Sequence, residues 1–161
     1  MVDSILADGL RWANLSNAAG HREAKTECRL LCVDPTRVAE LKSVAVPLIR
    51  RAVDRCGDWT VEAIWSALCE QRMLLWLVVR KLAVEGVVVT RLEQTPKDLV
   101  CVIVLCAGRH LLRSRHLIGT IEQFARAEGC ARLRLQGRRG WRRVFKEYSE
   151  PFITLEKCLE R

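Results

Sequence analysis

The spacing of apolar residues changes twice along the chain. From Asp34 to Glu70, apolar residues recur every three or four positions, which predicts helices. Asp34-Pro35 marks a helix start, because aspartate caps a first turn and proline suits the first helical position. Thr60 can cap a further helix that runs through about Glu70. Between these two helix starts, Pro47 either interrupts the first helix or opens a second one.

Three apolar, β-prone runs follow, at residues 73–80, 84–94 and 98–106. Short polar breaks separate them, and this arrangement predicts an antiparallel meander of three strands. A glycine inside the second run, Gly86, indicates a bulge there.

The helical period returns after residue 108, with a stripe from Leu117 to Ala125 that Gly129 ends as a C-terminal cap. Residues 131–136 then form a short strand, and a strand–helix–strand unit makes this strand parallel to the third one. Another helix starts near residues 137–140, and a last strand covers residues 151–159. The fold class is therefore α/β (α+β), with a mixed, mostly antiparallel sheet of about five or six strands flanked by helices.

The same periodicity assigns inward-facing positions to these elements. We expect the following residues to be largely buried: Trp65, Leu75, Leu77, Val88, Val102, Val104, Ile121, Phe124, Leu133, Leu135 and Val144.

Length and composition describe a globular protein. The 161 residues suit one domain, and half of them are hydrophobic. Apolar runs reach only about eight residues, whereas a membrane helix needs about 20. The acidic start, Met1–Ser4, lacks the features of a signal peptide. We expect no membrane contact, and a protein of the cytoplasm or of something assembled there.

Eight cysteines are present, and no pair has the C-x-x-C spacing of a zinc knuckle. The nearest pair is Cys28 and Cys32, and no matching second pair follows it. We expect reduced thiols that act as small core residues, and no bound metal.

The net charge of +8 is unevenly placed. Residues 109–146 contain eleven Arg or Lys and two acids, a balance of 11 − 2 = +9, so the remainder is close to neutral. This asymmetry indicates a polyanionic neighbour, either nucleic acid or an acidic protein surface. The alternative is a solvated helix face together with an exposed strand edge.

Three stretches of sequence resemble a known family. They are residues 57–65 with Leu75–Val78, residues 87–91 with Pro96-Lys97, and residues 122–130 with 137–143. The chain resembles the GNAT N-acetyltransferases, and more closely the GNAT-like proteins encoded by tailed bacteriophages. The resemblance covers residues 34–161, the expected GNAT-like domain, and leaves residues 1–33 as an N-terminal extension or docking arm.

The resemblance implies an acetyl-CoA phosphate loop with the pattern Arg/Gln-x-x-Gly-x-Gly/Ala. Glycines allow the backbone to approach the phosphates closely at a helix N-terminus. In the best register, Leu112 stands at the first glycine and Ser114 at the second small residue. We therefore expect weak acetyl-CoA binding or none. If the protein is active, the cofactor-binding residues are Leu105, Ala107, Arg109, Arg113, Ser114 and Arg115.

The general acid of many GNAT enzymes is a tyrosine in the helix that follows the parallel strand. Here Phe145 occupies that position, and phenylalanine cannot donate a proton. Tyr148, one turn later, is the catalytic candidate if the protein is active. The candidate general bases are Glu93, near a strand end, and Glu85.

These features favour a non-catalytic GNAT-like structural protein of a bacteriophage particle, assembled in the bacterial host cytoplasm. Its partners would be other virion proteins in an oligomeric assembly, with possible contact to packaged DNA. The first alternative is an acetyl-CoA-dependent N-acetyltransferase, and the second is a nucleic-acid-binding module with an Arg-rich face. The expected partner contacts are Ile5, Leu10, Trp12, Arg138, Arg139, Arg142 and Arg143.

Overall fold

The computed structural model describes residues 28–56, 58–108, 117–137 and 139–150. Its centre is one sheet of five strands in the order β1-β2-β3-β4-β5. The strands are β1 (Arg29–Cys32), β2 (Leu74–Arg80), β3 (Ala83–Gln94), β4 (Leu99–Gly108) and β5 (Arg132–Leu135). Strands β1 to β4 pair antiparallel, and β5 pairs parallel to β4. The structure confirms the expected meander and the expected parallel strand.

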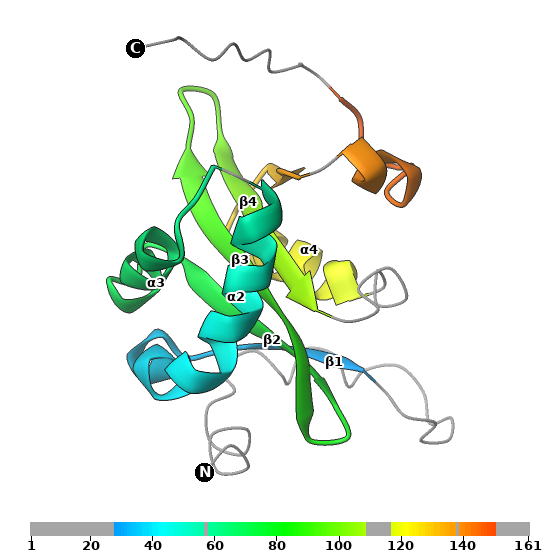
Figure 1. Cartoon of the computed structure of the whole chain (residues 1–161). Coiled ribbons are helices and arrows are strands. Elements are labelled where there is room, and N and C mark those ends of the chain that lie inside the picture. The colour runs from blue at the N-terminus through cyan, green and yellow to red at the C-terminus, as the bar shows by residue number, and fades with distance from the viewer. Residues whose placement is uncertain (1–27, 57, 109–116, 138, 151–161) are drawn as a thin grey trace, which may run out of the picture.

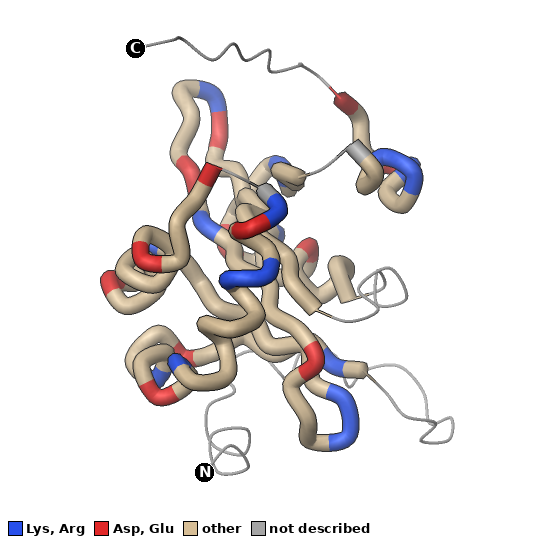
Figure 2. Tube along the Cα trace, in the orientation of Figure 1, with Lys and Arg blue, Asp and Glu red and all other residues tan. Residues whose placement is uncertain are grey.

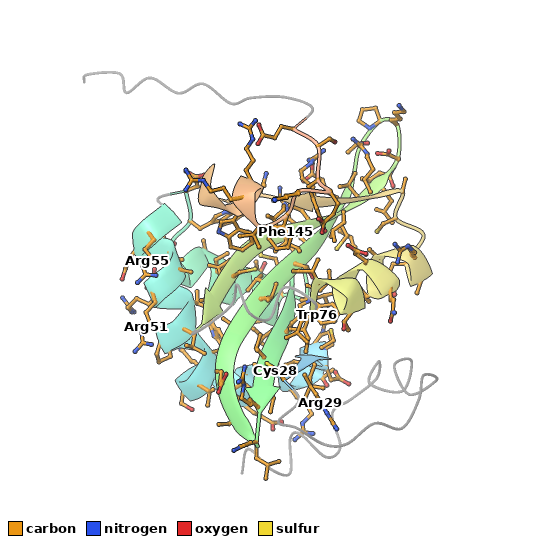
Figure 3. The ribbon with its side chains drawn as sticks, turned by 90° about the vertical axis from the view of Figure 1, so that its right-hand side faces the viewer. Cys28, Arg29, Arg51, Arg55, Trp76 and Phe145 are labelled. Carbon is orange, nitrogen blue, oxygen red and sulfur yellow. The ribbon has the colours of Figure 1, made fainter. Side chains whose placement is uncertain are left out.

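Helices cover both faces of this sheet (Figures 1 and 3). The 3-10 helix η2 (Pro35–Leu41) runs into α2 (Lys42–Cys56), and α3 (Val61–Cys69) packs beside them on one face. Helix α4 (Ile118–Ala127) lies on the opposite face. A short 3-10 helix, η4 (Arg139–Arg143), follows β5.

Local signals set most of the helix ends. The Asp34 side chain accepts a hydrogen bond from the Thr36 N–H, and the Thr60 side chain accepts one from the Ala63 N–H. Gly129, just after α4, has a φ of +77°, the left-handed conformation that favours glycine at a helix end. These three boundaries confirm the sequence-based prediction.

Both expectations for Pro47 were wrong, because α2 continues through it from Lys42 to Cys56. Proline removes one backbone N–H from the helix ladder and strains the preceding turn. Here Pro47 is exposed, while Ala45, Ile49 and Ala52 on the other side of α2 are buried. Burial of that apolar side holds the helix together despite the lost hydrogen bond.

The apolar core has one layer on each face of the sheet. Under α2 and α3 it includes Leu75, Leu77, Val89, Val100 and Val102. Under α4 it includes Trp76, Val88, Ile103, Ile121 and Phe124. Seven of the expected core residues are buried: Leu75, Leu77, Val88, Val102, Val104, Ile121 and Phe124. Four others are only half-buried: Trp65, Leu133, Leu135 and Val144.

Strand β3 carries the expected bulge at Gly86. Val78 pairs with Gly86 and Val79 with Val84, so Glu85 is the extra residue. A Cβ on Gly86 would lie 2.6 Å from the Ala107 carbonyl oxygen, which is too close for any side chain. The bulge is therefore tied to close contact between β3 and β4.

The N-terminal segment expected to lie outside the domain is described only from residue 28. Within it, Arg29–Cys32 forms β1 and pairs with β2 from Arg29↔Val79 to Cys32↔Trp76. This part of the segment belongs to the sheet, while the boundary at residue 33 is otherwise untested. Residues 1–27 and the expected strand at 151–159 lie outside the described residues. No helix in the described part of the chain is long and apolar enough to span a membrane.

Candidate active site at the β4–β5 junction

The most distinctive backbone feature is the point where β4 and β5 part. Their pairing runs from Val100↔Arg132 to Ile103↔Leu135, and the Gln136 N–H donates to the Ile103 carbonyl oxygen at 3.2 Å. Strand β4 then continues to Gly108. Within the described ranges, no strand pairs with this edge of β4 beyond Ile103. Residues 104–108 therefore border a wedge between β4 and the chain that leaves β5.

A second bulge lies at the vertex of this wedge. Val89 pairs with Leu105 and Thr90 with Ile103, so Val104 is the extra residue on β4. Val104 and Leu105 consequently both join the core layer under α2 and α3. Bulges re-aim backbone groups and occur often beside active sites. Here the bulge directly follows the last residue of β4 that pairs with β5.

The cofactor-binding candidates are divided by this geometry. Leu105 and Ala107 lie on β4 beyond the vertex, and both side chains are buried. They can therefore meet a bound molecule through their backbone rather than through their side chains. Arg109, Arg113, Ser114 and Arg115, together with Leu112, lie outside the described residues.

The candidate base Glu93 lies at the closed end of the β4–β5 pair, on the face covered by α2. Its register partner is Val100, at the start of the pairing with β5. The Glu93 carboxylate accepts hydrogen bonds from Arg91 at 2.8 Å and from Arg134 at 3.3 Å. Both of its oxygens are thus held by guanidinium groups. Glu85, the other carboxylate considered, forms an ion pair with Arg80 at 3.2 Å.

The candidate acid Tyr148 contacts α4. Its hydroxyl donates a hydrogen bond to the Glu122 carboxylate at 3.3 Å. Burial raises the pKa of Tyr148 above its ordinary value, and the negative charge of Glu122 acts in the same direction. Tyr148 is therefore protonated at neutral pH, and its hydroxyl proton points at the Glu122 carboxylate.

Phe145 occupies the centre of a small aromatic group that also fixes Tyr148. Its ring centroid lies 5.7 Å from that of Trp141 and 5.4 Å from that of Tyr148. Phe145 is buried, and Figure 3 shows it above the end of the sheet. The side chain at the position expected for the family's tyrosine is thus a packing residue.

The described part of the basic segment, residues 117–137 and 139–146, does not form one continuous face. Arg132 and Arg134 pair with Val100 and Val102 and so lie on the α2 face, whereas Arg126 extends from α4 on the other face. Several of these arginines form ion pairs: Arg126 with Glu122, Arg132 with Asp98, Arg134 with Glu93, and Arg142 with Glu150. Figure 2 shows further basic residues on α2 and at the tip of the β2–β3 hairpin.

The expected contact residues lie mostly beyond what the structure describes. Ile5, Leu10, Trp12 and Arg138 lie outside the described residues, as does the side chain of Arg139. Arg142 and Arg143 are exposed on η4. The assembly contacts expected from these residues therefore stay a prediction.

Cysteines of the described chain are free, and most are buried or half-buried. Burial raises the pKa of Cys32 and of Cys101 to about 12, so both thiols stay protonated and unreactive. Cys69 differs in being exposed. Among the described residues, no group of three metal-ligating side chains comes together.

Comparisons with known proteins identify the fold. No family model matches the sequence, and no curated protein sequence matches it. Among solved structures, the chain is similar to a ribosomal-protein-alanine N-acetyltransferase from Brucella melitensis biovar Abortus 2308. The two share 14% identity at a TM-score of 0.58, over 83% of this chain and 100% of that one.

Two further structures agree with this assignment. A GNAT family acetyltransferase from Staphylococcus aureus matches with 12% identity and a TM-score of 0.56, over 82% of this chain and 98% of that one. A "predicted acetyltransferase with acetyl-CoA" from Clostridium acetobutylicum matches with 12% identity and a TM-score of 0.56, over 84% and 96%. The chain therefore has the GNAT-like fold expected from the sequence. None of these three structures is described as a bacteriophage protein, so that part of the expectation stays a prediction.

The sequence analysis missed the residues that define the junction. Nothing in the apolar run of β4 distinguishes Val104 from its neighbours, because a bulge without glycine leaves no compositional mark. The link between Arg91, Glu93 and Arg134 joins β3 to β5, which are 41 residues apart at Glu93 and Arg134. Only the alternation of arginine and leucine at residues 132–135 could have indicated that β5 presents a charged face.

Proposed function

We propose that this protein is an acetyl-CoA-dependent N-acetyltransferase that binds acetyl-CoA in the wedge between β4 and β5. The observation that supports this proposal most strongly is the end of β4–β5 pairing at Ile103, with the Val104 bulge immediately after it. The GNAT-like fold supports this function over the structural role that the sequence favoured. At these identities the similar structures define the fold alone, so the activity rests on the junction.

The residues of the wedge fit such a ligand. When bound, acetyl-CoA supplies an acetyl thioester, and its pantetheine arm carries amide groups that can pair with a strand edge. Residues 104–108 provide that edge with buried side chains at Val104, Leu105 and Ala107. An apolar lining with backbone donors excludes water and strengthens hydrogen bonds to the ligand.

The Val104 bulge is suited to the reacting carbonyl. A bulge leaves its extra residue outside the regular ladder. Backbone N–H groups aimed at a carbonyl oxygen stabilise the charge that develops there during acyl transfer. Tyr148 stays the candidate proton donor, although its raised pKa makes it a weaker acid than an ordinary tyrosine. Its hydroxyl would have to leave Glu122 to reach a leaving group.

The test is a calorimetric titration with acetyl-CoA, with ADP as the matched ligand. ADP carries the adenosine and pyrophosphate without the pantetheine arm. If the wedge holds the arm, acetyl-CoA binds with micromolar affinity and roughly tenfold or more tighter than ADP. Equal affinities would mean that the protein binds only the adenosine and pyrophosphate, and that the wedge does not bind the pantetheine arm.

Acetyl transfer itself is best followed by mass spectrometry of a panel of amines. Thiol-reactive dyes are unsuitable, since the chain has eight cysteines of its own. Replacing Leu112 with glycine is expected to tighten acetyl-CoA binding by roughly tenfold, because glycine allows closer approach of backbone to phosphate. No acetylated product from any amine would contradict the enzymatic proposal.

A non-catalytic structural role in a bacteriophage particle is the second candidate. The observation that favours it is Phe145, a buried packing residue where a proton donor is expected. Its test is deletion of residues 1–27, which leaves β1 intact because β1 begins at Arg29. The shortened protein is expected to stay folded by circular dichroism while its incorporation into particles falls. Unchanged incorporation would contradict this role.

A further inference from the structure

A charged cluster lies on the face covered by α2, alongside the paired part of β4 and β5 that ends at the vertex. We call it the Arg91 cluster, and it comprises Trp59, Arg91, Glu93 and Arg134. Glu93 accepts from Arg91 at 2.8 Å and from Arg134 at 3.3 Å. The Arg91 guanidinium also lies over the Trp59 ring, 5.9 Å from its centroid. The side chains of Arg91, Glu93 and Arg134 are 31%, 33% and 24% exposed, so ligands can reach them while much of each is shielded from water.

Strand register places this cluster next to the site. Arg91 pairs with Val102 on β4, and Val102 pairs with Arg134 on β5. Paired residues point to the same face of a sheet, and Val102 belongs to the core layer under α2. The next pair along, Ile103↔Leu135, is the last one before the strands part. A molecule at the vertex on this face therefore lies one residue from Arg134.

Arg91 has more hydrogen-bond donors than Glu93 can use. A guanidinium has five N–H donors. In the described part of the chain, Arg91 donates to Glu93 alone, and its Nε is buried with no hydrogen-bond partner. The side chains of Arg91, Arg134 and Glu93 together carry two positive charges and one negative charge. Partial burial makes that charge more effective than it would be in water.

We propose that the Arg91 cluster binds a carboxylate on the acceptor, so that the substrate is an amine that also carries a carboxylate. Guanidinium groups match carboxylates in shape and charge through paired N–H···O bonds. A monoanion fits better than a dianionic phosphate, because Glu93 repels additional negative charge. This assignment rests on the proposed function, since it places the acceptor at the vertex where the acetyl group would be transferred.

Direct binding tests the assignment without any acetyl transfer. The probes are the free amino acids and their amides, which differ in the carboxylate, with inorganic phosphate as a third arm. Binding is measured by calorimetry, and NMR signals of the Trp59 indole N–H and the arginine Nε groups locate it. We expect at least one amino acid to bind roughly tenfold more tightly than its amide and than phosphate.

Three variants separate recognition from structural damage. Arg134→Gln removes one guanidinium and is expected to weaken carboxylate binding roughly tenfold while leaving amide binding nearly unchanged. Glu93→Gln removes the carboxylate that competes with the ligand, so this variant is expected to bind the ligand carboxylate more tightly. The matched control is Arg72→Gln, an exposed arginine after α3 that pairs with Glu70, and it should change nothing. Tighter binding in Glu93→Gln would support the proposal, because damage to the fold can weaken binding but cannot strengthen it. Unchanged or weaker carboxylate binding, in a Glu93→Gln protein as stable as the unmodified one, would overturn the proposal.

Titrating acetyl-CoA into the same samples distinguishes the two proposals. If the protein binds acetyl-CoA but binds amino acids no more tightly than their amides, the carboxylate assignment is overturned and the proposed function stands. Carboxylate binding without acetyl-CoA binding overturns the acceptor role and the proposed function together. Binding of both, with the expected order of variants, supports both.

Discussion

Gly86 and Gly108 lie opposite each other in β3 and β4, and neither position has room for a side chain. A Cβ on Gly86 would lie 2.6 Å from the Ala107 carbonyl oxygen, and a Cβ on Gly108 would lie 2.7 Å from the Gly86 Cα. The two backbones are thus packed together at the open end of β4. This contact holds the strand in place where it borders the wedge.

Replacing Gly86 with alanine is therefore expected to destabilise the protein by about 1–3 kcal/mol, because backbone atoms must move to admit the methyl group. Urea denaturation followed by circular dichroism measures this loss. Gly119→Ala is the matched control, since nothing lies within 4 Å of a Cβ at that helical position. It should stabilise α4 by about 0.5–1 kcal/mol, in line with the helix preference of alanine over glycine. A stable Gly86→Ala protein would mean that β3 and β4 are farther apart than described.

Thr90 is buried and accepts a hydrogen bond from the Trp76 indole N–H at 2.9 Å. Thr90→Val keeps the shape of the side chain but leaves that buried N–H without a partner. We expect a loss of about 1–3 kcal/mol in unfolding free energy. Thr90→Ser keeps the hydroxyl, so it should retain the hydrogen bond and lose less. Equal losses in the two variants would contradict a stabilising role for the hydrogen bond, since Thr90→Ser keeps the hydroxyl and Thr90→Val does not.

Phe124 anchors α4 to the sheet. It is buried, and its ring meets that of Trp76, which Figure 3 labels, edge-on with centroids 5.2 Å apart. Phe124→Ala is expected to cost about 3–5 kcal/mol, through lost burial and the cavity left behind. Gln123→Ala, an exposed neighbour on the same helix, should change stability little. A loss below about 1 kcal/mol for Phe124→Ala would mean that another stripe of α4 faces the sheet.

Tyr148 offers a direct titration, because it is the single tyrosine of the sequence. Its pKa is raised by burial and by Glu122, so phenolate absorbance should appear at higher pH in the folded protein than in denaturant. Since the folded-state pKa is raised, the stabilising contribution is complete below the unfolded pKa of about 10 and is lost as pH rises through the folded value. Glu122→Gln should lower the folded-state pKa of Tyr148. An unchanged titration in that variant would contradict the hydrogen bond to Glu122.

Elements with local signals could be predicted from the sequence alone. The caps at Asp34 and Thr60, the stop at Gly129 and the bulge at Gly86 each depend on side-chain chemistry within a few residues. The meander and the parallel strand follow from apolar periodicity and from the handedness of strand–helix–strand connections. These signals sufficed for the fold class.

Features that depend on contacts between distant segments required the tertiary structure. Pro47 stays inside α2 because burial of Ala45 and Ile49 outweighs one lost hydrogen bond, and burial is not visible in local sequence. Arg29–Cys32 joins the sheet because β2 offers an edge more than 40 residues later. No local pattern encodes that pairing.

The candidate site lies wholly in this second category. The vertex after Ile103 exists because β5 ends at Leu135 while β4 continues, and the Val104 bulge arises from its register with β3. The sequence predicted a strand at residues 98–106, which the structure places at Leu99–Gly108, and it shows arginine alternating with leucine at residues 132–135. Only the tertiary structure decided that Arg134, next to the last β4–β5 pair before the vertex, meets Glu93, because that contact depends on the register of three strands at once.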